Sequence, residues 1–118
     1  MDVQQIQEFF RSTDAGEQDA LRNYLHADVR VTLIGVEGVL EPFDLGGYLR
    51  FIAESIAHRK SRGERTEHVP IKIDGDLIAI RGHLRITAPG EADEVHPYMD
   101  ILKLRDGKIA EYDIAYDI

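Results

Sequence analysis

The chain has 118 residues, 43% of them apolar and 31% charged, which suits one soluble domain spanning 1–118, and its lack of cysteine excludes disulfides and cysteine metal sites. Its net charge of −8 argues against a nucleic acid partner, because attraction to phosphates needs a basic face. No apolar run approaches the roughly 18 residues that cross a membrane, and the N-terminus lacks the pattern of a secretory signal, so we expect a cytoplasmic protein.

The chain begins with two predicted helices and a strand. Apolar residues recur at helical spacing over residues 2–11, which predicts the first helix. Asp14 resembles an N-cap, with Glu17 as its capping-box partner, and together they predict the start of a second helix. Alternating apolar and polar residues over 29–33 then predict a strand that ends at Gly35.

A third helix is predicted between Asp44, which can cap it, and Arg62-Gly63, where it should stop. The one basic run of the chain, 58–62, lies at this predicted helix end. Cations there complement the helix dipole, which is the simpler interpretation, and a phosphate-binding patch is the alternative.

The second half of the chain reads as strands joined by turns. The turn signals are Asp74-Gly75, Ala88-Pro89-Gly90 and Asp106-Gly107. They separate strands over Glu67–Ile73, Leu77–Thr87, Val95–Arg105 and Lys108–Ile118. Helix, helix, strand, helix and four strands make an α+β pattern, with helices packed on one side of a curved, mainly antiparallel sheet.

The turns fix an expected register for the last three strands. The two-residue loop Asp106-Gly107 sets Asp100 opposite Asp113. Centring the earlier turn near residues 90–91 sets Arg81 opposite Asp100 and His83 opposite Tyr98. A slip of one residue at the turn over 88–93 would move Arg81 to the other face of the sheet.

With this register, one face of the sheet resembles a ligand pocket and the other a dimer interface. The pocket face has a polar end, with Arg81, His83, Tyr98, Asp100 and Asp113, and an apolar base, with Leu77, Ala79, Leu102, Leu104 and Ile109. The opposite face is too apolar to leave in water, so we expect a homodimer formed through this outer face. Its expected residues are Ile78, Ile80, Leu84, Ile86, Met99, Ile101, Tyr112 and Ile114.

Asp100 and Asp113 are the sharpest candidates for chemistry. Two adjacent carboxylates cannot both ionise cheaply, so one pKa should rise unless a cation such as Arg81 lies between them. The pair then suits general acid–base catalysis, with His83 as a proton shuttle. The alternatives are a buried Arg–Asp network and a packed histidine. We expect no metal, because arginine at the centre of the site disfavours one, and we interpret His26, His58 and His68 as surface residues.

The whole chain resembles the SnoaL-like branch of the nuclear transport factor 2-like superfamily. The resemblance rests on Ala15-Gly16-Glu17, on Tyr24–Val29 leading into the first strand, and on Leu104–Ile109. It implies a cone-shaped barrel, in which a strongly bent mixed sheet wraps three helices around a deep pocket, and frequent dimers. Known activities of the superfamily include ketosteroid isomerisation, epoxide hydrolysis, dehydration and polyketide cyclisation.

The ketosteroid isomerases provide one set of residues for comparison. Their first-helix tyrosine corresponds to Phe9, which has no hydroxyl. Their aspartate base corresponds to Leu33, which cannot take a proton. Only their protonated aspartate is matched, by Asp100. Steroid isomerase chemistry by that route is therefore not expected.

Two other branches match the chain in part. The arginine of the limonene-epoxide hydrolases corresponds to Arg81, whereas their two aspartates fall on His83 and on Ile114, one residue from Asp113. The scytalone dehydratases use histidines in the same cavity, which supports His83 as an acid–base residue.

We therefore expect an acid–base enzyme without a cofactor, of isomerase, hydrolase, dehydratase or cyclase type. Its ligand would be a compact apolar metabolite with a carbonyl, epoxide or hydroxyl group, bound through Tyr98, Leu33, Phe9 and Leu102. The alternative is a ligand-binding dimer of the same fold without turnover.

Overall fold

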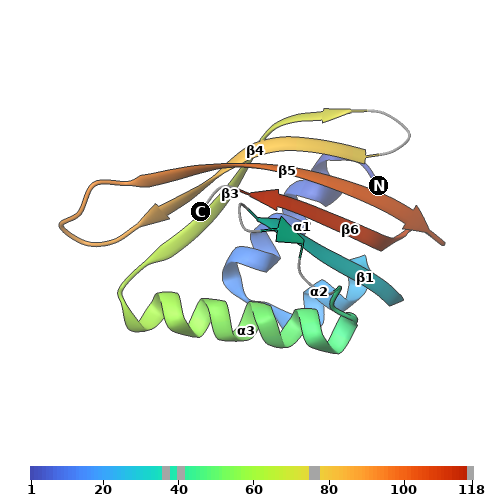
Figure 1. Cartoon of the computed structure of the whole chain (residues 1–118), viewed down its shortest axis with the longest axis horizontal. Helices are drawn as coiled ribbons and strands as arrows, with labels where there is room; N and C mark the ends of the chain where they lie inside the picture. The colour runs from blue at the N-terminus through green and yellow to red at the C-terminus, as the bar shows by residue number, and fades with distance from the viewer. Residues whose placement is uncertain (36–37, 40–41, 75–77, 117–118) are drawn as a thin grey trace.

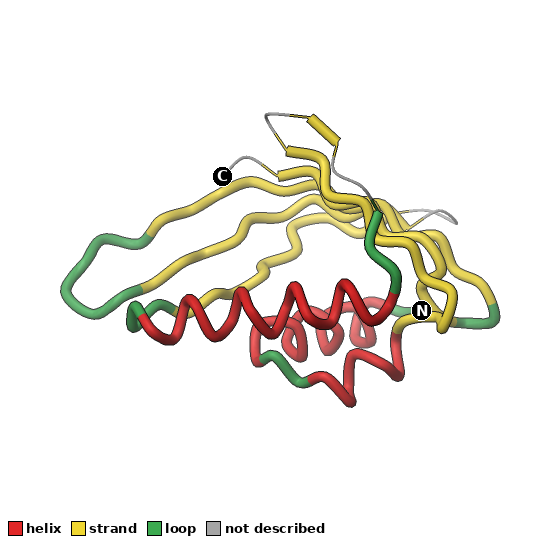
Figure 2. The backbone as a smooth tube through the Cα atoms, turned by 60° about the horizontal axis from the view of Figure 1, so that its bottom comes forward, coloured by secondary structure: helices red, strands yellow, loops and turns green. Residues whose placement is uncertain are grey.

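The computed structural model describes residues 1–35, 38–39, 42–74 and 78–116. In these residues, three helices pack against one face of a curved six-stranded sheet (Figures 1 and 2). The helices are α1 (Val3–Ala15), α2 (Gln18–Tyr24) and α3 (Leu45–Ser61). The strands are β1 (Leu25–Gly35), β2 (Gly38–Val39), β3 (Arg65–Asp74), β4 (Ile78–Thr87), β5 (Glu94–Arg105) and β6 (Lys108–Tyr116). Within this arrangement the predicted α+β class, with three helices in a curved, mainly antiparallel sheet, is confirmed.

The sheet is mixed and open. Its strand order is β2-β1-β6-β5-β4-β3, in which β1 runs parallel to β6 and the other neighbours are antiparallel. The sheet bends over the helices, so that α3 lies along its concave side (Figure 2). Buried apolar residues from the helices and from the concave face form one core, and they include Ile6, Phe9, Leu21, Val31, Tyr48, Ile80, Leu102 and Tyr112.

The first helix is longer than the sequence indicates. It begins after Asp2, which forms a capping box with Gln5, and ends at Gly16, whose φ of 69° closes the helix in the left-handed conformation. Asp14 therefore lies in the last turn of α1, and its prediction as an N-cap is wrong. Glu17 occupies the N-cap of α2, but its side chain accepts no capping hydrogen bond from that helix.

The third helix was predicted closely. Asp44 caps it by accepting a hydrogen bond from the backbone N–H of Gly47 at 2.7 Å, and Ser61 is its last residue. The basic residues of its last turn lie where they complement the helix dipole. In the described part of the chain, no helix is long and apolar enough to cross a membrane.

A β-bulge in β6 overturns half of the predicted register. Asp106 and Gly107 form the expected turn, both with positive φ, and Leu104 pairs with Ile109 as predicted. The pairing then shifts by one residue, so that Ala110 is the extra residue of a bulge. The side chains of residues 111–115 consequently point to the face opposite to the predicted one.

The consequence is that Asp100 pairs with Ile114 and not with Asp113. Tyr112 is buried on the concave side, and Asp113 pairs with Ile101 on the outer face. The predicted contact between the two aspartates is therefore wrong.

The register between β4 and β5 also differs by one residue. Ile80 pairs with Asp100, and Arg81 pairs with the exposed Met99. The connection between β4 and β5 contains a tight turn, in which Glu91 N–H donates to Ala88 C=O at 3.2 Å. The connection continues to residue 93, and this extra length offsets the two strands. Arg81 and Asp100 therefore lie on opposite faces, which corrects the predicted pairing.

The predicted faces of the sheet are thus exchanged in part. Ile78, Ile80, Ile86 and Tyr112 are buried on the concave side, although they were expected on the outer face, whereas Met99 and Ile101 do lie outside. The predicted apolar base at Leu77, the turn residue Gly75 and the strand end at 117–118 lie outside the described residues.

Candidate active site

A cavity of about 310 Å³ lies between α3, the end of α1 and the concave face of the sheet. Most of its wall is apolar, and α3 contributes one side of it. Its polar lining residues come from α1, α3, β3, β5 and β6. They are Thr13, Asp14, Tyr48, Ser55, Arg59, Thr66, His68, His96, Tyr98, Asp100 and Tyr112. An apolar cavity with a few convergent polar groups is the usual form of a small-molecule site.

Asp100 is the buried carboxyl group of this cavity. Its side chain is 1% exposed, and the Tyr112 hydroxyl donates a hydrogen bond to its Oδ2 at 3.1 Å. Burial raises the pKa of Asp100 to about 7, while the nearby His68 and the Tyr112 hydrogen bond offset part of that rise. At neutral pH, protonated and ionised forms of this carboxyl are therefore both populated, as general acid–base catalysis requires.

Two buried polar atoms of the cavity-lining residues are left unpaired. Within the described chain, neither Asp100 Oδ1 nor the Tyr98 hydroxyl has a hydrogen-bond partner, although both are buried. Burial also raises the pKa of Tyr98, so its hydroxyl keeps its proton. Buried polar groups without partners are costly, and a ligand oxygen is one way to satisfy them.

Gly82 makes room for the Tyr98 ring. It pairs with Tyr98 across the β4–β5 ladder. A Cβ atom at position 82 would lie 2.6 Å from the Tyr98 hydroxyl oxygen and 2.5 Å from the Val69 carbonyl oxygen. Only glycine allows the tyrosine to lie across β4 in this position.

His68 and Asp14 form a second polar group in the cavity wall. The Asp14 carboxylate accepts three hydrogen bonds, from the Thr66 hydroxyl at 2.9 Å, from the His68 backbone N–H at 2.7 Å and from His68 Nδ1 at 2.7 Å. A carboxylate can only accept, so it assigns the proton of the neutral ring to Nδ1. Nε2 is then the proton acceptor of the imidazole.

Aromatic rings hold the imidazole in place. Phe10 stacks on His68 at a centroid distance of 5.0 Å and an interplanar angle of 10°, and Tyr98 meets it edge-on at 5.4 Å. The histidine is therefore fixed by ring packing as well as by Asp14. A base held in one orientation is prepared for proton transfer.

Of the eight predicted site residues, three line the cavity and two others lie in the core. Asp100, Tyr98 and Leu33 are in its wall. Phe9 and Leu102 are fully buried in the core, where their side chains pack against neighbours and not against the cavity.

The structure does not bring the remaining predicted residues to Asp100. Arg81, His83 and Asp113 belong to the outer face, where they pair with Met99, Pro97 and Ile101 respectively. The predicted proximity of all three to Asp100 is wrong, and the predicted pairing of His83 with Tyr98 is also wrong, because of the two register shifts.

Sequence reasoning missed His68 and Asp14. The interpretation of His68 as a surface residue is wrong, since only 22% of its side chain is exposed. The two residues are separated by 54 positions, so no local spacing connects them. One signal was available: His68 lies on the strand after the third helix, where the cone shape implied by the family resemblance brings that strand over the first helix.

Among the described residues, no group of three or more histidine, aspartate or glutamate side chains could hold a metal ion.

Comparison with known proteins agrees with the fold. A family model described as a SnoaL-like domain matches residues 6–112, and no functionally curated protein matches the chain. Wild-type IdmH from Streptomyces antibioticus, described as a candidate polyketide cyclase, is 21% identical over 96% of this chain and 89% of its own, with a TM-score of 0.73.

Two further solved structures are similar. A hypothetical protein of ketosteroid isomerase-like fold from Catenulispora acidiphila, in complex with trimethylamine, is 13% identical over 100% of this chain and 88% of its own, with a TM-score of 0.74. A candidate SnoaL-like polyketide cyclase from a Jannaschia species is 16% identical over 97% of this chain and 83% of its own, with a TM-score of 0.69. At these identities the likeness establishes the fold and not an activity.

Proposed function

Because the chain belongs to the SnoaL-like family of the nuclear transport factor 2-like superfamily, we propose that it is a cofactor-independent acid–base enzyme acting on a compact, largely apolar small molecule. The observation that carries this proposal is the pair of unpaired buried polar atoms, Asp100 Oδ1 and the Tyr98 hydroxyl, in the wall of an apolar cavity. A carbonyl oxygen of the ligand would satisfy both of them.

The chemistry that fits these groups is proton abstraction next to a carbonyl group. Protonated Asp100 and Tyr98 would donate hydrogen bonds to the ligand oxygen and stabilise the negative charge that develops there. His68 would take the proton through Nε2, while Asp14 stabilises the resulting imidazolium. Return of the proton to another carbon gives an isomerisation, and attack of the enolate on a second carbonyl gives a ring closure.

Hydrogen–deuterium exchange tests this reaction without the natural substrate. A panel of cyclic ketones is incubated with the protein in D₂O, and exchange of the protons next to the carbonyl is followed by NMR. We expect the wild type to accelerate the exchange and His68→Gln to reduce the rate constant by about 100-fold. Ketone affinity, measured by calorimetry, should change little.

Asp100→Asn should also slow the exchange while preserving affinity, because an amide N–H stabilises the negative charge that develops on the ligand oxygen less than a protonated carboxyl does. Asp113→Asn is the matched control, since Asp113 is on the outer face. A wild-type protein that binds the ketones tightly but exchanges them no faster than His68→Gln would contradict the enzyme proposal.

That result would favour the second candidate, a ligand-binding homodimer without turnover. The outer face of the sheet supports a dimer, because β5 exposes Val95, Met99 and Ile101 to 56%, 61% and 41%. This apolar strip is flanked by Arg81 on β4 and by Asp113 on β6. A two-fold axis through the strip would set the basic edge of one copy against the acidic edge of the other.

Light scattering across a range of protein concentrations tests the dimer. We expect a dimer for the wild type and a monomer for Met99→Lys, because lysine would be buried between the two sheets. A monomeric wild type at high concentration would rule this interface out, and it would leave the cavity chemistry untouched.

A further inference from the structure

A second groove, of about 730 Å³, adjoins the cavity, because the two share four lining residues. Basic side chains from α1, α3, β3 and β4 converge on this groove, together with four acidic ones. The basic residues are Arg11, Arg59, Lys60, Arg65 and Arg85, the acidic residues are Asp14, Glu64, Glu67 and Asp93, and the shared ones are Asp14, Ile56, Arg59 and Thr66.

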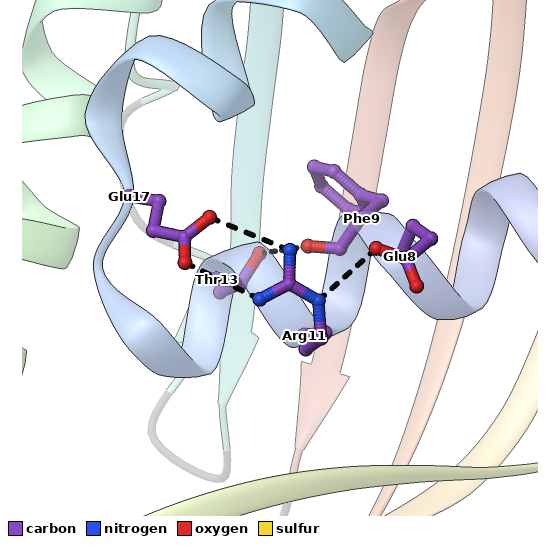
Figure 3. A network of polar contacts seen from close by, with 5 residues as sticks. All are labelled: Glu8, Phe9, Arg11, Thr13 and Glu17. Carbon is purple, nitrogen blue, oxygen red and sulfur yellow. Dashed lines mark hydrogen bonds and ion pairs between the residues drawn. The ribbon is translucent and has the colours of Figure 1, made fainter.

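Two of these cations already have partners that occupy them. Arg11 lies between Glu8, on the same helix, at 3.0 Å and Glu17, just after that helix, at 3.2 Å (Figure 3). Arg85 pairs with Glu67 at 3.5 Å. Neither guanidinium is therefore the primary receptor for another anion.

The cations at the end of α3 retain a positive surplus. Glu64, whose side chain is 8% exposed, is shared by Arg59 at 3.2 Å and Arg62 at 3.0 Å, so two positive charges face one carboxylate. Lys60 and Arg65 form no ion pair with any other described residue. Arg59 lines both the groove and the cavity, so this surplus lies where the two meet.

The helix dipole explains only part of this arrangement. It accounts for basic residues in the last turn of α3, as the sequence suggests. It does not account for Arg65, which comes from β3 and faces the same groove. The groove lining also holds five basic residues against four acidic ones, in a chain of net charge −8.

We infer that the ligand has an apolar body, held in the cavity, and an anionic end, a carboxylate or a phosphate, held in the groove by Lys60 and Arg65 beside Arg59. This inference rests on the proposed function, because it takes the cavity to be the substrate site. It adds that the substrate is charged at one end. A phosphate-binding patch, the alternative interpretation of the basic run over 58–62, would be one form of this site.

Calorimetry with three eight-carbon probes tests the inference: octanoate, octyl phosphate and the neutral octan-2-one. We expect the two anions to bind the wild type about tenfold more tightly than the ketone. The double substitution Lys60→Gln/Arg65→Gln should weaken anion binding by about five- to tenfold and leave ketone binding unchanged. Whichever anion loses more affinity identifies the preferred group.

Lys108→Gln is the matched control, because Lys108 is an exposed cation at the other end of the sheet, next to the β5–β6 turn. It should change none of the three affinities. Equal binding of ketone and anions by the wild type, or an equal loss for all three probes in the double variant, would overturn the inference. An intact anion preference without deuterium exchange would contradict the proposed reaction alone.

Discussion

Replacing Asp100 by asparagine should stabilise the protein relative to wild type, and the gain should grow as the pH rises. The carboxyl titrates at about 7 in the folded chain and at 3.8 in its ordinary state. Between these values the folded state holds a proton that the unfolded state has lost. Wild-type stability therefore falls as the pH rises through this window and levels off above it. Asparagine cannot ionise, so the variant is spared this loss.

The size of the effect follows from the same two values. One pKa unit is worth about 1.4 kcal/mol, so ionising Asp100 costs the folded state about 4 kcal/mol at full titration. Between pH 5 and pH 8 the cost grows by about 2 to 3 kcal/mol. For a chain of this length, that difference corresponds to about 10 °C in Tm.

Urea unfolding followed by circular dichroism measures this difference directly. The free energy of unfolding is determined at pH 5 and at pH 8 for wild type, Asp100→Asn and the outer-face control Asp113→Asn. The advantage of Asp100→Asn over wild type should widen by about 2 to 3 kcal/mol between the two pH values, while the control follows the wild type. If the advantage is the same at both pH values, burial does not keep this carboxyl protonated and the reasoning is wrong.

Three further substitutions test the surroundings of the carboxyl. Tyr112→Phe removes the hydrogen bond to the buried aspartate, which should raise that group's pKa further and move it upward in an NMR titration. Asp14→Asn should cost about 1–3 kcal/mol in urea unfolding and slow proton exchange, with little effect on ketone affinity, because His68 loses its orienting partner. Gly82→Ala should destabilise the folded protein by about 1–3 kcal/mol in urea unfolding. The helix control Gly46→Ala should be neutral or stabilising, because its added Cβ meets nothing closer than 3.8 Å. Equal effects of the two glycine changes would refute the packing argument.

The sequence predicted the fold because its local signals agree with one another. Helical spacing, the Asp44 cap and the turn at Asp106-Gly107 each depend on neighbouring residues, and each was found where expected. The error in α1 has the same origin. Asp14 has the side chain of an N-cap, but its carboxylate is used by β3, which no local pattern reveals.

The candidate site was harder to predict because strand register decides it. A bulge at Ala110 has no glycine or proline to mark it. A weaker signal was present, since strict alternation from Ile109 would turn Glu111 and Asp113 toward the core, and Tyr112 and Ile114 toward water. Burying Tyr112 and Ile114 costs less free energy than burying two carboxylates, and this difference favours the bulged register.

The predicted ion pair failed for a reason that also explains the chemistry. A buried carboxylate can be stabilised by a cation or can avoid its charge by keeping a proton. The expected partner, Arg81, would have fixed Asp100 in its ionised form and lowered its pKa. The structure instead buries Asp100 on the face opposite to Arg81, with one hydrogen bond from the Tyr112 hydroxyl, and burial raises its pKa to about 7. A carboxyl paired with arginine would be a structural anchor, whereas this one can gain and lose a proton under physiological conditions, and that difference is what makes the cavity a candidate active site.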